Sequence, residues 1–296
     1  MTDGAVVSTG STDGAGWTDG AGSTGGSDAA RLAGYVEVWW QAVDDFTRLL
    51  EELSDEDWHR PTDLPGWDVH DVAAHTAHLE AVLAGAPEET VDVGQPPHVT
   101  GLLGLYTEQG VVARKDRTPD ELITEIRESA TARHTALLAD PPTDAGASPP
   151  RMFGGVGWSW ERLLRNRPLD VWMHDQDVRR AVGRPGGLDG AAAVHVADYL
   201  AESLGFVLAK KVGAAPGTTV LLLVHGHAPV AYAVDEAGRG VRLAEAPTEP
   251  TATIACDRET FVVLAGGRRR AEDRAVSLRG DVALARQVVD ALAVTP

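Results

Sequence analysis

Residue types that bind metal ions stand at two distant places in the chain. Asp170 and His174 lie four residues apart, and His75 lies far upstream. Because an α-helix makes one turn in about 3.6 residues, a helix through 168–177 would project Asp170 and His174 from one face. A carboxylate and two imidazoles make a site with three protein ligands, at which a tetrahedral ion keeps one position open for chemistry. These residues are therefore candidate metal ligands.

Other interpretations of the same residues remain open. An aspartate and a histidine four residues apart also form ordinary solvated pairs on helix surfaces. His75 falls on an apolar stripe with Val72 and Leu79, where an unpaired imidazole is costly to bury, but a core histidine with a hydrogen-bond partner also fits there. His70 and His78 share its predicted helix and compete with it as ligands.

Further side chains lie close to the candidate ligands in sequence. Asp177 stands about one turn beyond His174 and either orients that imidazole, as metal-bound histidines require, or faces solvent. A group of tryptophans forms either bundle core or the walls of a dry pocket over an ion: Trp67, Trp158, Trp160 and Trp172.

A helical region is expected to position these ligands. Apolar residues at helical spacing predict a first helix over about 29–53. A second helix follows the Asp68 cap, and a third opens at 118–121 with a proline at an early position. We expect loops over 84–117 and 141–157, and these loops would shape the substrate site.

The fourth helical stretch, 160–182, contains Pro168 and stops at Gly183. A glycine followed closely by a proline is a strong stop signal. A proline inside a helix lacks the amide donor and clashes with the preceding turn. We therefore expect the helix to restart at Pro168, with Asn166 or Arg167 at its cap.

The pattern changes after Gly187. One more helix is expected over 189–211, then strands at 220–224, 230–234, 240–243, 252–255 and 275–278, with helices at 257–264 and 281–293. The predicted fold class is α+β, with a disordered tail at 1–28, a helical bundle at 29–185 and a smaller α+β domain at 186–296.

Composition limits the classes of function. The chain has 296 residues, 43% of them hydrophobic, and a formal net charge of -18, which argues against nucleic acid as a partner. No apolar run is long enough to predict a membrane span, and the N-terminus lacks the features of a signal peptide. The single cysteine, Cys256, can form no internal disulfide, so a reducing, cytoplasmic setting is the simplest interpretation.

Two further features bear on chemistry. The cluster Arg268–Arg270, with Arg274 nearby, is either a solvated loop or an anion-binding edge for a charged substrate or cofactor. Cys256 falls in a predicted strand and is interpreted as a small core residue. The chain thus has no good nucleophile of its own, and without a glycine-rich phosphate loop nucleotide chemistry is not indicated.

At these motifs the chain resembles a known family. The segment 64–75, with its Pro-Gly-Trp turn, and the segment 170–181 resemble the two metal motifs of the mycothiol-dependent maleylpyruvate isomerase family. The C-terminal part is similar to that family's sterol carrier protein-like domain, as 265–269 and 278–281 indicate. The likeness covers roughly residues 30–296.

The resemblance implies a DinB-like four-helix bundle that holds a divalent ion, commonly zinc, with His75, Asp170 and His174 as ligands. The family often has glutamate where this chain has Asp170, which is one methylene shorter. The implied cofactor is mycothiol, bound as thiolate at the ion, with Arg268 and Arg269 as candidate cofactor contacts. The implied activity is isomerisation of a small electrophile or transfer of the thiol to it.

A different class of function stays open from the sequence. The bundle could keep its ion for stability alone, while the C-terminal domain binds a small ligand in a pocket lined by 220–224 and the closing helix. Such a protein would be a non-catalytic binding or regulatory protein. For either class we expect small-molecule partners, no nucleic acid, no membrane, and a monomer or weak homo-oligomer.

Overall fold

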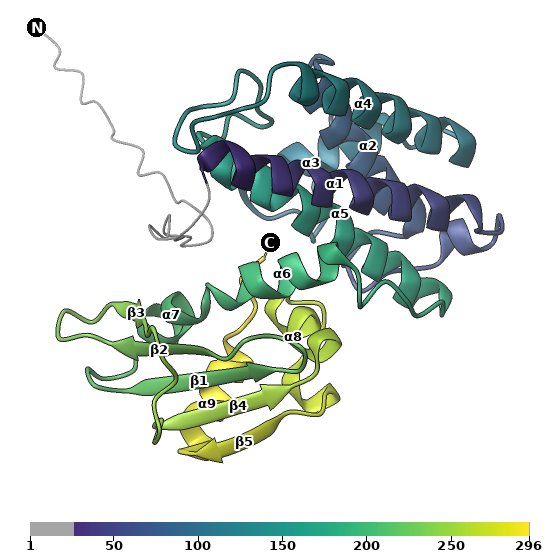
Figure 1. Ribbon diagram of the computed structural model, residues 1–296. Helices are drawn as coiled ribbons and strands as arrows, with labels where there is room; N and C mark the ends of the chain where they lie inside the picture. The colour runs from purple at the N-terminus through teal and green to yellow at the C-terminus, as the bar shows by residue number, and fades with distance from the viewer. Residues whose placement is uncertain (1–26, 296) are drawn as a thin grey trace, which may run out of the picture.

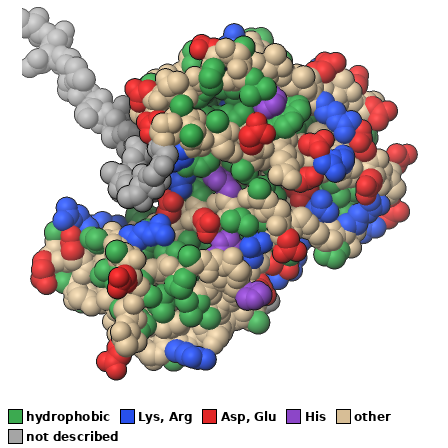
Figure 2. Space-filling view, viewed as in Figure 1, with side chains coloured by type: hydrophobic (Ala, Val, Ile, Leu, Met, Phe, Trp, Pro, Cys, Tyr) green, Lys and Arg blue, Asp and Glu red, His purple; other side chains and the backbone are tan. Residues whose placement is uncertain are grey.

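The computed structural model describes residues 27–295, the side chain of Asp273 apart, and Figure 1 shows a helical part above a sheet-containing part. Of the predicted disordered tail, residues 1–26 lie outside the described residues. Ser27 caps the first helix and Asp28 begins it. On the face drawn in Figure 2, acidic and basic side chains are interspersed over both parts.

Four helices form a closed bundle in the N-terminal part. Helix α1 contacts α4 and α5, and α2 contacts the same two helices. The bounds are Asp28–Glu51 for α1, Val69–Ala84 for α2, Pro119–Ala139 for α4 and Trp160–Val182 for α5. The predicted caps at Asp68 and Thr118 are present as capping boxes. Large apolar side chains fill the interior, among them Trp39, Phe46, Val72, Leu122, Ile126 and Val171.

One further helix lies where a loop was expected. Helix α3 (Gly101–Ala113) packs against α2, so the expectation of a loop throughout 84–117 is wrong over these residues. Its sequence carries weak helix signals. It contains three glycines, and Thr100 at its N-cap makes no side-chain capping bond. Its apolar residues also show almost no helical periodicity, and several of them are exposed.

Helix α5 runs unbroken through Pro168, so the expected restart at that residue is wrong. Its end at Gly183, with φ of 68°, is as predicted. A proline within a helix costs about 3 kcal/mol, whereas each fully buried apolar side chain contributes about 1.5–3 kcal/mol. Tertiary packing therefore outweighs the proline, because α5 buries apolar residues on both sides of it: Leu163, Leu164, Val171 and Trp172.

The C-terminal part contains a mixed five-stranded sheet of order β3-β2-β1-β4-β5. Only the β1–β4 pair is parallel. The strands are β1 (Thr219–Val224), β2 (Val230–Val234), β3 (Gly240–Arg242), β4 (Ala252–Cys256) and β5 (Ser277–Gly280), all within two residues of their predicted positions. Helices α8 (Arg258–Ala265) and α9 (Val282–Asp290) accompany the sheet. The predicted α+β class is confirmed.

A buried helical stretch joins the two parts. It consists of α6 (Ala191–Ala201), α7 (Leu204–Phe206) and a π-helical turn at Val207–Lys211. Helix α6 contacts α1 and α5 on one side and α8 on the other (Figure 1). Contrary to expectation, Ala191–Lys211 is long and apolar enough to cross a membrane by composition, but 67% of its most apolar window is buried. Such burial is typical of a core helix.

Candidate metal centre

The structure brings the three sequence-predicted ligands together. His75 comes from α2, and Asp170 and His174 come from successive turns of α5. Oδ1 of Asp170 lies 3.6 Å from Nε2 of His75 and 3.6 Å from Nε2 of His174. One candidate ligand atom from each residue lies within 4.8 Å of the others. Both histidines are buried, and Asp170 is 20% exposed, so the group opens toward solvent only at the carboxylate.

The donor set and its spacing fit a divalent ion. Zinc binds imidazole nitrogen and carboxylate oxygen at about 2.0–2.2 Å, which sets tetrahedral ligand atoms about 3.4 Å apart. The two nitrogen–oxygen distances of 3.6 Å are close to that value. The two imidazole rings stand edge to face with centroids 4.9 Å apart, which lets both Nε2 atoms face the carboxylate.

The charged groups around the site keep Asp170 ionised. Burial alone would raise the pKa of Asp170, but the Arg167 guanidinium and the two imidazoles hold that pKa well below its usual value. Asp170 is therefore an ionised carboxylate at neutral pH, as a ligand must be. Burial lowers the pKa of His75, whereas the carboxylates of Asp170 and Asp177 outweigh burial and raise the pKa of His174.

Asp177 supports His174 from behind. Its Oδ2 lies 3.3 Å from Nδ1 of His174, and its side chain is fully buried, which excludes the solvent-facing alternative. An Nδ1–H that donates to this carboxylate leaves Nε2 as the free electron pair, the tautomer that a metal ligand needs. Burial opposes the negative charge of Asp177, but Arg268 and His174 lower its pKa.

The predicted cofactor contacts Arg268 and Arg269 lie at the boundary between the two parts. Arg268 makes a two-pronged contact with Asp177, at 3.2 Å from Nε to Oδ1 and 3.1 Å from Nη2 to Oδ2. Arg269 pairs with Asp63, which also accepts a bond from Arg180. Arg268 of the C-terminal part therefore contacts Asp177, the residue that holds His174. Cofactor binding by Arg268 or Arg269 stays a prediction.

Two family models match the chain. The mycothiol maleylpyruvate isomerase N-terminal domain matches residues 39–179, and the MDMPI C-terminal domain matches residues 194–287. The chain belongs to the mycothiol-dependent maleylpyruvate isomerase family. Family and fold agree with the resemblance that the motifs indicated, and His75, Asp170 and His174 form a candidate metal site within this fold.

Solved structures support the same fold. The crystal structure of the mycothiol-dependent maleylpyruvate isomerase is 18% identical, with a TM-score of 0.53, and the match covers 83% of this chain and 92% of that one. A histidine-to-alanine mutant of that isomerase matches over the same shares at 18% identity, with a TM-score of 0.51. No curated protein matches the sequence. At 18% identity, the likeness of this chain to the two solved structures shows the fold alone.

Trp67, from the Pro-Gly-Trp turn before α2, forms a wall of the site. Its ring centroid lies 5.0 Å from that of His75 and 6.3 Å from that of His174. Its Nε1 donates to Oε2 of Glu108 at 2.9 Å, and Glu108 belongs to the unpredicted helix α3. Of the other tryptophans, Trp158 packs on Phe153 in a separate apolar cluster.

His70 and His78, the competing ligands, lie outside the group of three. Nε2 of His70 contacts the carbonyl oxygen of Arg117 at 2.8 Å. His70 also clusters with Asp68 and Asp71, but these aspartates form the capping box of α2. Nδ1 of His78 lies 3.5 Å from Nη1 of Arg114, which also binds Glu89.

The burial of His78 predicts a loss of stability in mild acid. Burial and the neighbouring Arg114 cation lower the pKa of His78 from 6.5 to about 4. The folded protein therefore holds this imidazole neutral, and its contribution is present above pH 6.5 and lost as the pH falls toward 4. We expect the unfolding free energy of the wild type to fall by about 2–3 kcal/mol more than that of His78→Gln over this interval. Denaturant titrations at several pH values measure the difference, and parallel curves would contradict it.

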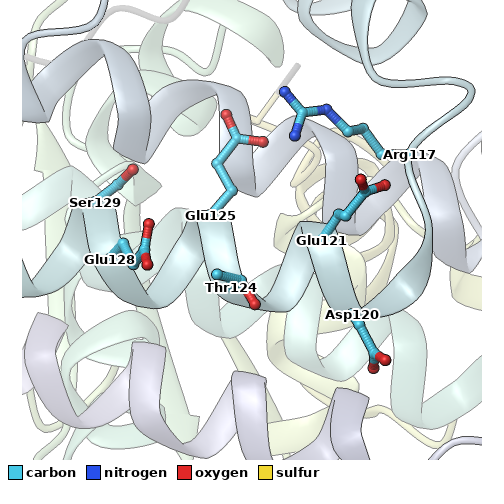
Figure 3. A pocket seen from close by; sticks show the side chains of 7 residues that line it. All are labelled: Arg117, Asp120, Glu121, Thr124, Glu125, Glu128 and Ser129. Carbon is cyan, nitrogen blue, oxygen red and sulfur yellow. The ribbon is translucent and has the colours of Figure 1, made fainter.

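A hollow on α4 is separate from the metal group. Figure 3 shows that it is lined by side chains from one face of this helix together with Arg117. The helix contributes mostly acidic and hydroxyl groups: Asp120, Glu121, Thr124, Glu125, Glu128 and Ser129. The candidate ligands come from α2 and α5 instead. This hollow is therefore not part of the site.

Proposed function

We propose that the chain is a divalent-metal-dependent enzyme that uses a low-molecular-weight thiol, mycothiol, on a small electrophilic substrate. The reaction is either isomerisation or transfer of the thiol. The observation that carries this proposal is the convergence of His75, Asp170 and His174 within a fold of the mycothiol-dependent maleylpyruvate isomerase family. Zinc is the proposed ion, because two imidazoles and a carboxylate are ligands that zinc accepts.

Each residue has a distinct task at the proposed site. His75, Asp170 and His174 would hold the ion, which when bound supplies a Lewis acid that keeps a thiol in its nucleophilic thiolate form. Asp177 keeps His174 in the required tautomer. Trp67 covers the two imidazoles on one side and limits the access of water there.

The chain's own thiol lies away from this site. Cys256, the single cysteine, lies on β4 in the other part of the molecule, where burial raises its pKa to about 12. Such a thiol is almost entirely protonated at neutral pH and unreactive. A borrowed thiol is consistent with this composition. We keep Arg268 and Arg269 as proposed contacts to that cofactor.

The remaining properties follow from the same proposal. A low-molecular-weight thiol cofactor is maintained in a reducing, cytoplasmic setting. The partners we propose are the thiol and a small electrophile, with neither nucleic acid nor membrane, and with the chain acting as a monomer or weak homo-oligomer.

Incubation of purified protein with mycothiol and a panel of small electrophiles tests the proposal. We expect product formation that a chelator stops and that His174→Ala lacks. An isomerase returns the thiol, so its concentration stays constant while product forms, whereas a transferase consumes thiol in step with product. Metal-loaded protein that turns over no member of the panel would favour the non-catalytic alternative.

A further inference from the structure

A chain of buried polar contacts joins the four bundle helices and ends at Asp170. Arg167 of α5 and Glu80 of α2 are both fully buried. Nε and Nη2 of Arg167 donate to Oε1 of Glu80 at 3.2 and 2.7 Å. Glu80 also accepts bonds from Trp39 of α1 at 3.0 Å and from Arg133 of α4 at 3.4 Å. Glu80 therefore links Arg167 of α5 to α2 directly and to α1 and α4 through its own contacts.

The two carboxylate oxygens of Asp170 face different partners. Nη1 of Arg167 donates to Oδ2 of Asp170 at 3.0 Å. The other oxygen, Oδ1, faces both His75 and His174 at 3.6 Å. A carboxylate without such a partner can rotate and offer both oxygens to an ion. Here the hydrogen bond holds the plane of the carboxylate and leaves one oxygen for coordination.

We propose that Arg167 is a positioning residue that makes Asp170 a single-oxygen ligand and holds it at the distance the two imidazoles require. This inference rests on the proposed metal-dependent function. The planar guanidinium suits the task, because its fixed fork of donors reaches Glu80 on one side and Asp170 on the other. A lysine ammonium at the same place keeps the charge but lacks that fork.

Metal affinity measures this role without any assay of activity. Metal-free wild type, Arg167→Met and Arg167→Lys are titrated with Zn²⁺ in competition with a chromophoric chelator. We expect the dissociation constant of Arg167→Met to rise about 10–100-fold, as for other residues that orient a metal ligand, and that of Arg167→Lys to rise less. If Arg167→Met does not fold, the milder Arg167→Lys carries the same test.

A matched control lies two residues away on the same helix. Arg165 is also largely buried, pairs with Glu202 and stacks on Tyr199 at 4.0 Å, yet has no contact with Asp170 among its described interactions. Arg165→Met is therefore expected to keep the wild-type affinity for Zn²⁺. If loss of packing alone lowered the affinity for Zn²⁺, both methionine variants would lose affinity to the same extent.

The visible spectrum of the Co²⁺-loaded protein separates positioning from stability. Release of Oδ2 lets Asp170 bind through two oxygens, which raises the coordination number and weakens the absorption. We expect this change in Arg167→Met and not in Arg165→Met. Unchanged spectrum and affinity in both Arg167 variants, or tighter binding, would overturn this inference alone. Wild type that binds no Zn²⁺ would overturn the proposed function with it.

Discussion

Purified His75→Ala will contain almost no divalent metal, whereas His78→Ala will retain it. His75 supplies one of only three donors at the group, and its Nε2 lies 3.6 Å from the shared carboxylate oxygen. Loss of a group that merely orients a ligand costs about 10–100-fold in metal affinity, so loss of a ligand will cost more than about 100-fold. Elemental analysis of dialysed protein, together with chelator competition, measures the effect.

His78 is the matched control because it shares the residue type, the helix and the burial of His75 but lies outside the group of three ligands. Both are buried histidines on the same helix, one turn apart, but His78 faces Arg114 instead of Asp170. Full metal content in both alanine variants would mean that the ion binds elsewhere. Loss of metal in both would point to disruption of α2 rather than to a specific ligand.

Replacement of Glu80 with glutamine will destabilise the fold by about 3–5 kcal/mol, the cost of removing one partner of a buried ion pair. Glu80 is fully buried between Arg133 and Arg167. Burial lowers the pKa of Arg133 to about 10, so this side chain is still charged at neutral pH. Without the carboxylate, Arg167 keeps Asp170 as an ion-pair partner, whereas Arg133 keeps none among the described residues. Chemical denaturation of the metal-free proteins measures the change.

The exposed pair Glu51–Arg127 provides the comparison. It also joins two bundle helices, α1 and α4, but its side chains are 44% and 41% exposed. Solvent screens such a pair, so Glu51→Gln will cost about 0–1 kcal/mol. Equal losses of stability in the two glutamine variants would contradict the larger cost that burial is expected to give at Glu80.

The candidate ligands could be predicted from the sequence because histidine and aspartate are residue types that bind metal ions. Asp170 and His174 share a helix face by spacing alone. Spacing could not place His75 beside them, because that contact depends on how α2 and α5 pack. The resemblance to the family implied that His75 joins Asp170 and His174. In the structure, Nε2 of each histidine lies 3.6 Å from Oδ1 of Asp170.

The supports of the site were harder to predict for a physical reason. Glu80 and Arg167 are charged residues, and charged residues usually face solvent, so an apolar-pattern analysis passes over them. Their burial depends on each other and on Arg133, which is a property of the assembled bundle. A signal was present, since Glu80 is the one polar residue in the segment 79–84 of α2.

The sheet domain was easier to predict than the bundle. Its central strand, β1, is a continuous apolar run bounded by turn residues, and its helices begin at side-chain caps such as Asp257 and Asp281. In the bundle, local rules failed at Pro168 and at α3 (Gly101–Ala113), where contacts distant in sequence decide the outcome. Glu108 of α3 is one such contact, because it holds Trp67 over the imidazoles.

X-ray absorption of the zinc-loaded protein, with and without mycothiol, tests the central claim most directly. We expect zinc to be bound by nitrogen and oxygen atoms of His75, Asp170 and His174 at about 2.0–2.2 Å, together with one further light atom. When mycothiol is added, sulfur at about 2.3 Å from the zinc should replace that further atom. A zinc shell that is closed by protein side chains and unaltered by the thiol would contradict it.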